Sequence, residues 1–355
     1  MSSDDWQALV DICRLTRWMD AQGLENGPIK DPKRLTGGTQ NLLLHFRRGE
    51  REFVLRRPPL HPRQDGSKTI AREARVLAAL AGTGVPHAGL IAACDDTAVL
   101  GAGFYLMQPV DGFNASAGMP ELHASDPQVR REMGFSMVDA LLRLGEVDYR
   151  AVGLDDFGKP EGFLQRQAPR WLSQLRSYSD YLGWPGAAGL PDVEAIGQWL
   201  VQNCPTHNTP GILHGDFHLS NVMFSNSGPQ LAAIVDWELA TLGDPLLDLG
   251  WLVVSWPEAD GRGAGTIHVQ PWGGFPSADE LIARYRAATR RDLSALDWYI
   301  VLAGFKLGIL LEGSYARACA GKAPMDVGQT HHASALRLFE RAHATLSRNK
   351  PNSQW

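Results

Sequence analysis

Cysteine is scarce in this chain, and its cysteines stand far apart. Four occur in 355 residues, and no two have the Cys-x-x-Cys spacing of a zinc site or a redox pair. We therefore expect reduced thiols that pack as small buried hydrophobic groups in a cytoplasmic protein. The four are Cys13, Cys94, Cys204 and Cys319.

An excess of basic residues is also missing. The chain has 34 Lys and Arg against 39 Asp and Glu, which gives a net charge of -5 and an isoelectric point near 6.1. A protein that holds a phosphate backbone needs a basic field. The charge balance therefore predicts no nucleic-acid partner.

Long apolar runs are absent as well. No stretch approaches the roughly 18 consecutive apolar residues of a membrane span. The first residues, MSSDDWQALVDICRLTRWMD, are acidic before they are apolar, unlike a signal peptide. We therefore expect neither membrane attachment nor secretion. With 44% apolar and 21% charged residues, the composition is that of an ordinary globular protein.

The pattern of elements changes along the chain. The first part predicts strands with one helix between them, after an amphipathic helix at the start. From about Pro127 onward the pattern is helical, interrupted by short strands near Ile212, Val222 and Ile234. The fold class we predict is α+β and bilobal, with a small β-rich N-terminal lobe (1–108) and a larger, mainly helical C-terminal lobe (109–355).

The expected elements of the first part are a helix over 5–22, a hairpin of 41–46 and 53–56 turning at Arg48-Gly49-Glu50, a helix over 69–82, and strands within 89–96 and 103–110. The expected helices of the second part are 127–146, 161–178, 192–204, 244–255, 278–290, 294–320 and 329–347. The Pro- and Gly-rich stretch 256–276 predicts a long loop, which in a compact domain is usually functional or mobile.

The stretch HGDFHLSNVMF carries the clearest chemical pattern. Transfer of a phosphoryl group needs one carboxylate to take or orient the acceptor's proton, and oxygen ligands for Mg²⁺ near the phosphates. Asp216 suits the first task, and Asn221, five residues on, suits the second. Asp236 follows the buried strand Leu231–Val235 and offers a second metal-binding carboxylate. We expect these three side chains to converge, although each alone is equally explained as a loop or turn residue.

These residues resemble a known family. HGDFHLSN followed by IVDWE and GDPLLDLG is similar to the aminoglycoside phosphotransferase and choline kinase group, which has a protein-kinase-like fold. The resemblance extends through most of the chain, because further motifs appear in order: GGTQN, FVLRR, REARVL, FYLMQPVDG, VGLDDFG, LQRQAPRW and FKLGILLEGSYARA. Together they look closest to the branch whose relatives are fused to acyl-CoA dehydrogenases in animals.

The resemblance implies an enzyme that uses ATP and Mg²⁺. By it, Asp216 matches the catalytic base, and Asn221 and Asp236 match the metal ligands. His214 and Asp248 are better explained as buried hydrogen-bond partners that hold the loop. Glu238 is either a further metal ligand or a solvated carboxylate.

The nucleotide-binding side is predicted from three segments. Gly37 and Gly38 before a strand allow backbone amides to approach phosphates, with Thr39 adding a hydroxyl, although two such glycines are also a simple turn. Arg56 takes the position that Lys occupies in most proteins with this fold. Glu73 is its expected partner on the next helix, with a surface ion pair as the alternative.

The hinge after the strand FYLMQPV is the third segment. Gln108 and Val110 would offer a main-chain carbonyl and amide to a purine edge. Met107 would wall the pocket, a role compatible with plain core packing. These residues complete the predicted nucleotide contacts.

The resemblance implies that the acceptor is a small hydroxylated molecule, and its charge is the next question. From residue 251 to the end there are 12 Lys and Arg against 9 Asp and Glu, which disfavours a polycationic antibiotic. Arg166 and Arg170 could face an anionic group, or form a solvated helix face beside buried Trp171. We predict a kinase for a hydroxyl of a small metabolite, such as a hydroxy acid or its thioester. The alternatives are an antibiotic O-phosphotransferase and a nucleotide-binding relative without activity.

Overall fold

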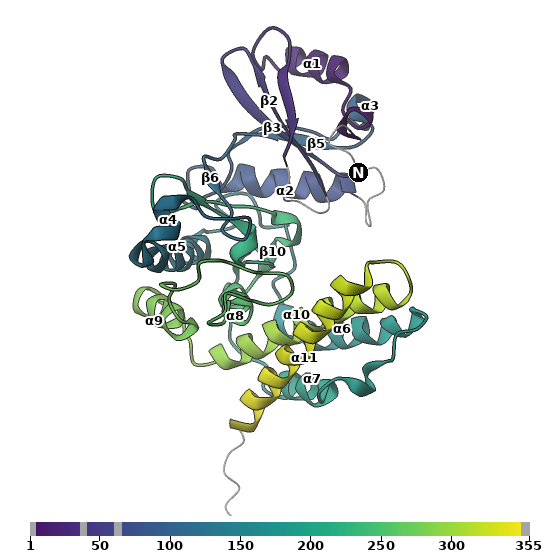
Figure 1. The fold of residues 1–355 in the computed structure, drawn as a ribbon, viewed down its shortest axis with the longest axis vertical. Coiled ribbons are helices and arrows are strands. Elements are labelled where there is room, and N and C mark those ends of the chain that lie inside the picture. Colours follow the sequence, from purple (N-terminus) through teal and green to yellow (C-terminus); the bar gives the residue numbers. More distant parts are fainter. Residues whose placement is uncertain (1–4, 36–40, 60–65, 349–355) are drawn as a thin grey trace, which may run out of the picture. The chain divides into compact units, whose positions relative to one another are not determined.

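The structure is a computed structural model that describes residues 5–35, 41–59 and 66–348. The chain forms two compact units, drawn as ribbons in Figure 1. Unit 1 consists of residues 1–112 and 232–240, and unit 2 of residues 113–231 and 241–355. The predicted division into lobes at residue 108 did not include residues 232–240 in the first lobe. That division stays a prediction.

Unit 1 is built on a five-stranded antiparallel sheet with the order β1-β2-β3-β5-β4. The predicted hairpin is present, and Gly49 at its turn has φ +57°, a backbone conformation that glycine adopts without strain. β3 is buried from Phe53 onward, as expected for a central strand covered on both faces. The strands are β1 (Lys30–Arg34), β2 (Leu42–Arg48), β3 (Arg51–Arg57), β4 (Leu90–Cys94) and β5 (Phe104–Met107).

Helices cover this sheet. The helix predicted over 5–22 is divided, because Asp11 caps a new helix by accepting the Arg14 backbone N–H at 3.0 Å. Leu15 and Met19 of that helix are fully buried in one cluster with β2 side chains. The helices are η1 (Asp5–Ala8), α1 (Ile12–Ala21), α2 (Gly66–Leu80) and α3 (Thr97–Leu100). α2 packs against β3, β4 and β5.

A distant segment completes unit 1. β9 (Leu231–Ile234) and the 3₁₀ turn η5 (Trp237–Leu239) follow unit 2 elements in sequence. The Ile234 backbone N–H donates to the Pro86 carbonyl at 2.9 Å, and Arg72 Nη2 donates to the Ala240 carbonyl at 3.2 Å. These bonds bring Asp236, which lies between β9 and η5, to α2.

Unit 2 is mainly helical, and all seven helices predicted for it are present. The α+β prediction, with strands first and helices after, is confirmed. The helices are α4 (Glu121–Ser125), α5 (Pro127–Glu146), α6 (Phe163–Arg176), η2 (Ser177–Asp180), η3 (Ala187–Gly189), α7 (Val193–Gln202), η4 (Leu219–Asn221), α8 (Leu246–Ser255), α9 (Ala278–Ala288), α10 (Leu296–Cys319) and α11 (Met325–Arg348). The short strands are β6 (Gly112–Phe113, at the boundary), β7 (Gly211–Leu213), β8 (Val222–Ser225) and β10 (Thr241–Gly243).

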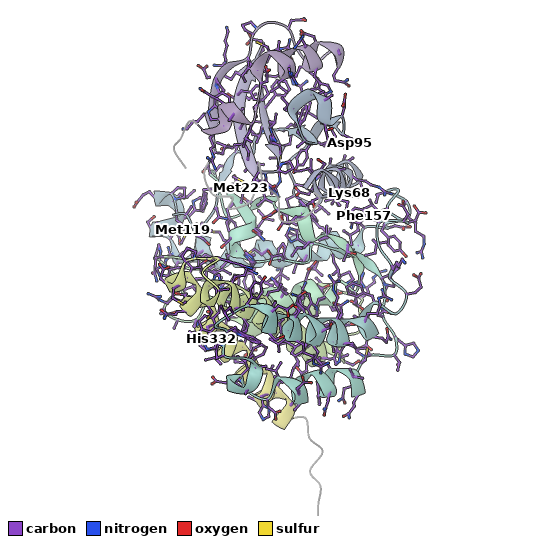
Figure 2. The ribbon with its side chains drawn as sticks, turned by 90° about the vertical axis from the view of Figure 1, so that its right-hand side faces the viewer. Lys68, Asp95, Met119, Phe157, Met223 and His332 are labelled. Carbon is purple, nitrogen blue, oxygen red and sulfur yellow. The ribbon has the colours of Figure 1, made fainter. Side chains whose placement is uncertain are left out.

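α10 is the central helix of unit 2 and is strongly apolar. It is long and apolar enough to cross a membrane, but 61% of its most apolar window is buried inside the protein. It packs against α8 and α11, and α11 is labelled at His332 in Figure 2. A helix that is apolar on most sides is what a buried core position requires.

The long loop 256–276 is anchored by its own aromatic side chains. Trp272 and Phe275 stack with ring centroids 4.5 Å apart, and Trp256 lies edge-on to both. The Trp256 indole N–H donates to the Pro276 carbonyl at 2.8 Å. Such clusters stabilise a loop that has little regular structure.

The cysteines only partly follow the expectation. All four are free. Cys94 is buried, Cys204 and Cys319 are half-buried, and Cys13 is exposed. Cys13 lies on the solvent side of α1, where a small side chain is tolerated without packing.

Candidate active site

The cation predicted for the nucleotide side is buried at the centre of unit 1. Arg56, on β3, is 8% exposed, and Glu73, on α2, is 1% exposed. Arg56 Nε lies 2.7 Å from Glu73 Oε2, and Nη2 donates to Glu73 Oε1 at 3.2 Å. The alternative of a surface ion pair is therefore wrong, and the predicted strand-to-helix pair is present.

The same guanidinium also contacts Asp236. Arg56 Nη2 lies 2.7 Å from Asp236 Oδ1, and Tyr105 donates its hydroxyl to Glu73 Oε2 at 2.9 Å. Burial by itself would lower the pKa of Arg56, but the neighbouring Glu73, with Tyr105 and Asp236, raises that pKa above its usual value. Arg56 therefore carries a permanent positive charge that joins β3, α2 and the end of β9.

Asp236 stands in a special backbone conformation. Its φ and ψ are +66° and +63°, in the left-handed region that L-residues other than Asn and Asp seldom adopt. Strained positions of this kind cluster at functional sites. The turn directs the carboxylate to Arg56 directly after the buried strand β9.

A group of carboxylates lies around this turn. Oxygens of Glu73, Asp236 and Glu238 lie within 4.8 Å of one another. Asp236 and Glu238 are half-buried, whereas Glu73 is buried. Hard carboxylate oxygens are the donors that Mg²⁺ prefers, so the donor set fits this cation. Of the two descriptions of Glu238, the geometry favours a place in this group.

In unit 2, the HGD segment forms the loop that carries Asp216. Asp216 Oδ2 accepts a hydrogen bond from Asn221 Nδ2 at 2.9 Å, and the Asp216 carbonyl accepts one from the same nitrogen at 3.0 Å. Asn221 is therefore held with its amide nitrogen toward Asp216. A role of Asn221 as a metal ligand, which stays a prediction, would use its side-chain oxygen.

His218 holds the other oxygen of Asp216. The Ser220 backbone N–H donates to His218 Nδ1 at 3.2 Å, so the ring proton is on Nε2. That atom lies 3.3 Å from Asp216 Oδ1. Burial would raise the pKa of Asp216, but the His218 hydrogen bond and nearby charges lower it below its usual value. Asp216 is thus an ionised, fixed carboxylate at neutral pH.

Buried partners hold the loop from behind. Asp248, on α8, is 2% exposed and accepts the backbone N–H groups of His214 and Gly215 at 2.7 and 2.9 Å. His214 Nδ1 accepts the Asp216 backbone N–H at 3.3 Å. The structure thus supports the interpretation of His214 and Asp248 as partners that shape the loop.

The remaining predicted nucleotide contacts lie in two segments. Gly37, Gly38 and Thr39 lie outside the described residues. Met107 and Val110 are half-buried and Gln108 is exposed at the end of β5. The Gln108 backbone N–H donates to the Gly89 carbonyl at 2.8 Å, which leaves its carbonyl for another group. Contact of these residues with a nucleotide stays a prediction.

The two predicted arginines of α6 are exposed. Arg166 donates to the backbone carbonyls of Lys159 and Glu161. Arg170 lies over the ring of buried Trp171, 5.5 Å from its centroid. This arrangement matches the solvated helix face, with Arg170 supported by an aromatic ring.

Two residues near Asp216 were missed by sequence reasoning. His218 lies inside the quoted motif, but its contact with Asp216 depends on the fold of the turn. Lys306, on α10, lies 90 positions beyond Asp216, yet its Nζ donates to the Gly215 carbonyl at 3.1 Å. The available signal was a lone lysine in the apolar stretch LAGFKLGILL, because buried lysines are rare without a partner.

The family follows from comparison with known proteins. The model of the family described as "Phosphotransferase enzyme family" matches residues 31–299, which include both Arg56 and the HGD segment. This chain belongs to that phosphotransferase family. The resemblance inferred from the motifs is thereby confirmed.

Relatives in animals show the predicted branch. The chain is 30% identical over 301 residues to acyl-CoA dehydrogenase family member 10 of Mus musculus, covering 82% of this chain and 27% of the relative. It is 29% identical over 310 residues to family member 11 of Gallus gallus, covering 83% and 38%. The chain therefore spans between about a quarter and two fifths of these relatives.

Solved structures share the fold. A Ralstonia eutropha protein provisionally assigned as an aminoglycoside phosphotransferase is 29% identical, with a TM-score of 0.77 over 94% of this chain and 98% of that chain. Plasmodium vivax ethanolamine kinase is 15% identical, with a TM-score of 0.60 over 93% and 89%. A thermostable mutant of aminoglycoside phosphotransferase APH(4)-Ia, in complex with AMP-PNP and hygromycin B, is 14% identical, with a TM-score of 0.54 over 93% and 99%. The protein-kinase-like fold of this phosphotransferase is confirmed.

Proposed function

We propose that this protein transfers the γ-phosphoryl group of ATP to a hydroxyl of a small metabolite, with Mg²⁺ as its metal. The observation that carries the proposal is the held carboxylate of Asp216, whose two oxygens are bonded to His218 and Asn221. Family membership supports the reaction class. A fixed, ionised carboxylate is what phosphoryl transfer asks of the protein beside the acceptor.

Asp216 is the proposed base. As the acceptor oxygen bonds to the γ-phosphorus and the bond from phosphorus to the ADP oxygen breaks, the acceptor's hydroxyl proton passes to the Asp216 carboxylate. The hydrogen bonds from His218 and Asn221 orient that carboxylate before substrate arrives. Such fixed geometry removes part of the entropic cost of the reaction.

Unit 1 is proposed to bind the nucleotide. Arg56 is the cation for the phosphates, and Glu73 fixes its direction through the pair between β3 and α2. Asp236 and Asn221 are the proposed ligands of Mg²⁺, with Glu238 next to Asp236. When bound, Mg²⁺ supplies positive charge that offsets the charge of the phosphates. Met107, Gln108 and Val110 are proposed to border the base.

The acceptor we favour is a hydroxy acid or its thioester. The balance of 12 basic to 9 acidic residues from 251 onward suits a neutral or anionic molecule better than a polycation. Two relatives are named as acyl-CoA dehydrogenase family members, and an acyl-CoA is a thioester. Ethanolamine and aminoglycosides, the acceptors named for two structural neighbours, are the competing class.

The test compares the wild type with Asp216→Asn on a panel of acceptors. The panel holds short hydroxy acids, hydroxyacyl thioesters, ethanolamine and hygromycin B, and formation of ADP and phosphorylated product is followed by mass spectrometry. We expect product with an acid or thioester, and a loss of about 10³-fold or more in kcat for Asp216→Asn. Asp95→Asn, an exposed carboxylate of unit 1 labelled in Figure 2, is the matched control and should keep full activity.

The outcomes separate the alternatives. Product formed only with hygromycin B would rule out hydroxy acids and thioesters as acceptors, but would still support phosphoryl transfer. Binding of Mg-ATP without turnover on any acceptor would favour a nucleotide-binding protein without catalysis. Full turnover by Asp216→Asn would remove Asp216 from the role of base.

A further inference from the structure

Lys306 is a buried cation in the middle of the apolar helix α10. The side chain is 9% exposed, and its neighbours along the helix, Phe305 and Ile309, are fully buried. Moving an ammonium group out of water is costly unless it gains partners. The partners of Lys306 are therefore informative.

Two tryptophans and one carbonyl surround the ammonium. Nζ lies 4.4 Å from the ring centroid of Trp251, on α8, and 5.6 Å from that of Trp171, on α6. Both distances are within the range of cation–π attraction. The directed bond goes to the Gly215 carbonyl at 3.1 Å, one residue before Asp216.

The backbone at Gly215 is held on two sides. Asp248 accepts the N–H groups of His214 and Gly215, while Lys306 donates to the Gly215 carbonyl. Gly215 has φ +86°, a conformation open to glycine, so this residue offers few steric limits of its own. The orientation of the peptide that leads into Asp216 therefore depends on these two side chains and on His214, whose Nδ1 accepts the Asp216 backbone N–H at 3.3 Å.

We propose that Lys306 is a positioning residue for Asp216, because its ammonium fixes the Gly215 carbonyl and thereby the direction of the Asp216 carboxylate. The inference rests on the proposed function and goes beyond it, since it assigns a task to a residue of α10 that does not touch the reacting atoms. A methionine would fill the same space without burying a charge. The charge itself is thus the feature to test.

The titration of Lys306 offers an independent readout. Burial lowers the pKa of Lys306 to about 8, although the facing carboxylates of Asp216 and Asp248 raise it, and Arg170 lowers it further. The ammonium is present below this pH and is lost as the pH rises through it. We expect kcat of the wild type to fall as the pH rises through about 8.

The test uses Lys306→Met, Asp216→Asn and the control Lys322→Met in the 355-residue chain. Lys322 is an exposed lysine of unit 2 that lies over the Tyr181 ring, so its removal also deletes a cation–π contact. We expect Lys306→Met to lower kcat about 10²-fold, as for other small misplacements of a reacting group. Its KM for Mg-ATP should stay within about twofold, because only transition-state geometry is changed. Its kcat should no longer depend on pH near 8.

Two further measurements keep the test decisive. Melting temperature distinguishes positioning from simple support: Lys306→Met should melt close to the wild-type temperature, because the desolvation cost of the ammonium, which is removed, offsets the lost bond to the Gly215 carbonyl. Hydrogen–deuterium exchange of the peptide 211–217 should speed up about tenfold in Lys306→Met, and not in Lys322→Met, as its local opening becomes easier.

The results assign failure to one proposal or the other. If Asp216→Asn is inactive while Lys306→Met keeps wild-type kcat, the role of Lys306 is overturned and the proposed function stands. If wild type and Asp216→Asn turn over alike, the proposed function fails, and the exchange rate alone decides whether Lys306 holds the loop. A wild-type kcat that is flat from pH 7 to about 9.5, well beyond the pKa of Lys306, also counts against the inference.

Discussion

At the scale of the residue, Arg56 shows why arginine and lysine are not interchangeable here. One guanidinium contacts Glu73 through two nitrogens and reaches Asp236 with one of them. A lysine ammonium is a single point charge and cannot span both carboxylates with the same geometry. The arginine is therefore suited to join two carboxylates as well as to bind phosphate.

Arg56→Lys is a direct test of this reasoning. We expect the affinity for Mg-ATP to fall about tenfold, or roughly 1.4 kcal/mol, because the carboxylate pair is no longer held in place. Isothermal titration measures the affinity, and Arg47→Lys, an exposed arginine of β2, is the control. Equal affinity in Arg56→Lys and the wild type would contradict the role of the planar cation.

At the scale of the element, Glu312 joins α10 to two other segments. The carboxylate is fully buried and accepts the Trp184 indole N–H and His332 Nδ1, each at 2.7 Å. His332 belongs to α11 and also stacks on Tyr315 at 4.4 Å. One acidic side chain therefore ties the central helix to α11 and to the loop after η2.

Glu312→Ala should destabilise unit 2. The change removes one partner of a buried polar pair and leaves the Trp184 and His332 donors without it, which costs about 3 kcal/mol. Urea unfolding followed by tryptophan fluorescence measures this free energy, and Glu340→Ala, an exposed change on α11, should cost less than about 0.5 kcal/mol. If Glu312→Ala lowered the free energy of unfolding no more than Glu340→Ala, the contacts of Glu312 with Trp184 and His332 would not stabilise unit 2.

At the scale of the whole molecule, ligand binding should be visible as stability. A ligand that binds only the folded state, present at a hundred times its Kd, adds about 2.7 kcal/mol to the free energy of unfolding. We expect Mg-ATP to raise the melting temperature, and EDTA with ATP to raise it far less. Asp236→Asn should remove most of the rise in melting temperature that Mg²⁺ adds to that of ATP, whereas Asp95→Asn should keep it. An equal Mg²⁺-dependent rise in both variants would exclude Asp236 as a ligand.

The helices of unit 2 and the order of strands before helices were predictable from the sequence, because hydrophobic periodicity and helix caps act within a few residues. At the start of α5, for example, Asp126 accepts the Gln128 backbone N–H just before Pro127. It also pointed to the family through HGDFHLSN and IVDWE. The division of the first helix at Asp11 was missed, because a local cap outweighed an amphipathic pattern that continues across it. Whether Asp216, Asn221 and Asp236 converge stays a prediction.

Contacts between residues far apart in the sequence became visible only in the folded structure. Arg56 meets Asp236, 180 positions further along the chain, because β9 and η5 return to α2. Lys306 meets the Gly215 carbonyl because α10 packs beside α8. Periodicity specifies which face of an element is buried, whereas the partner of a buried charge is set by how elements pack, and that information is spread over the whole chain.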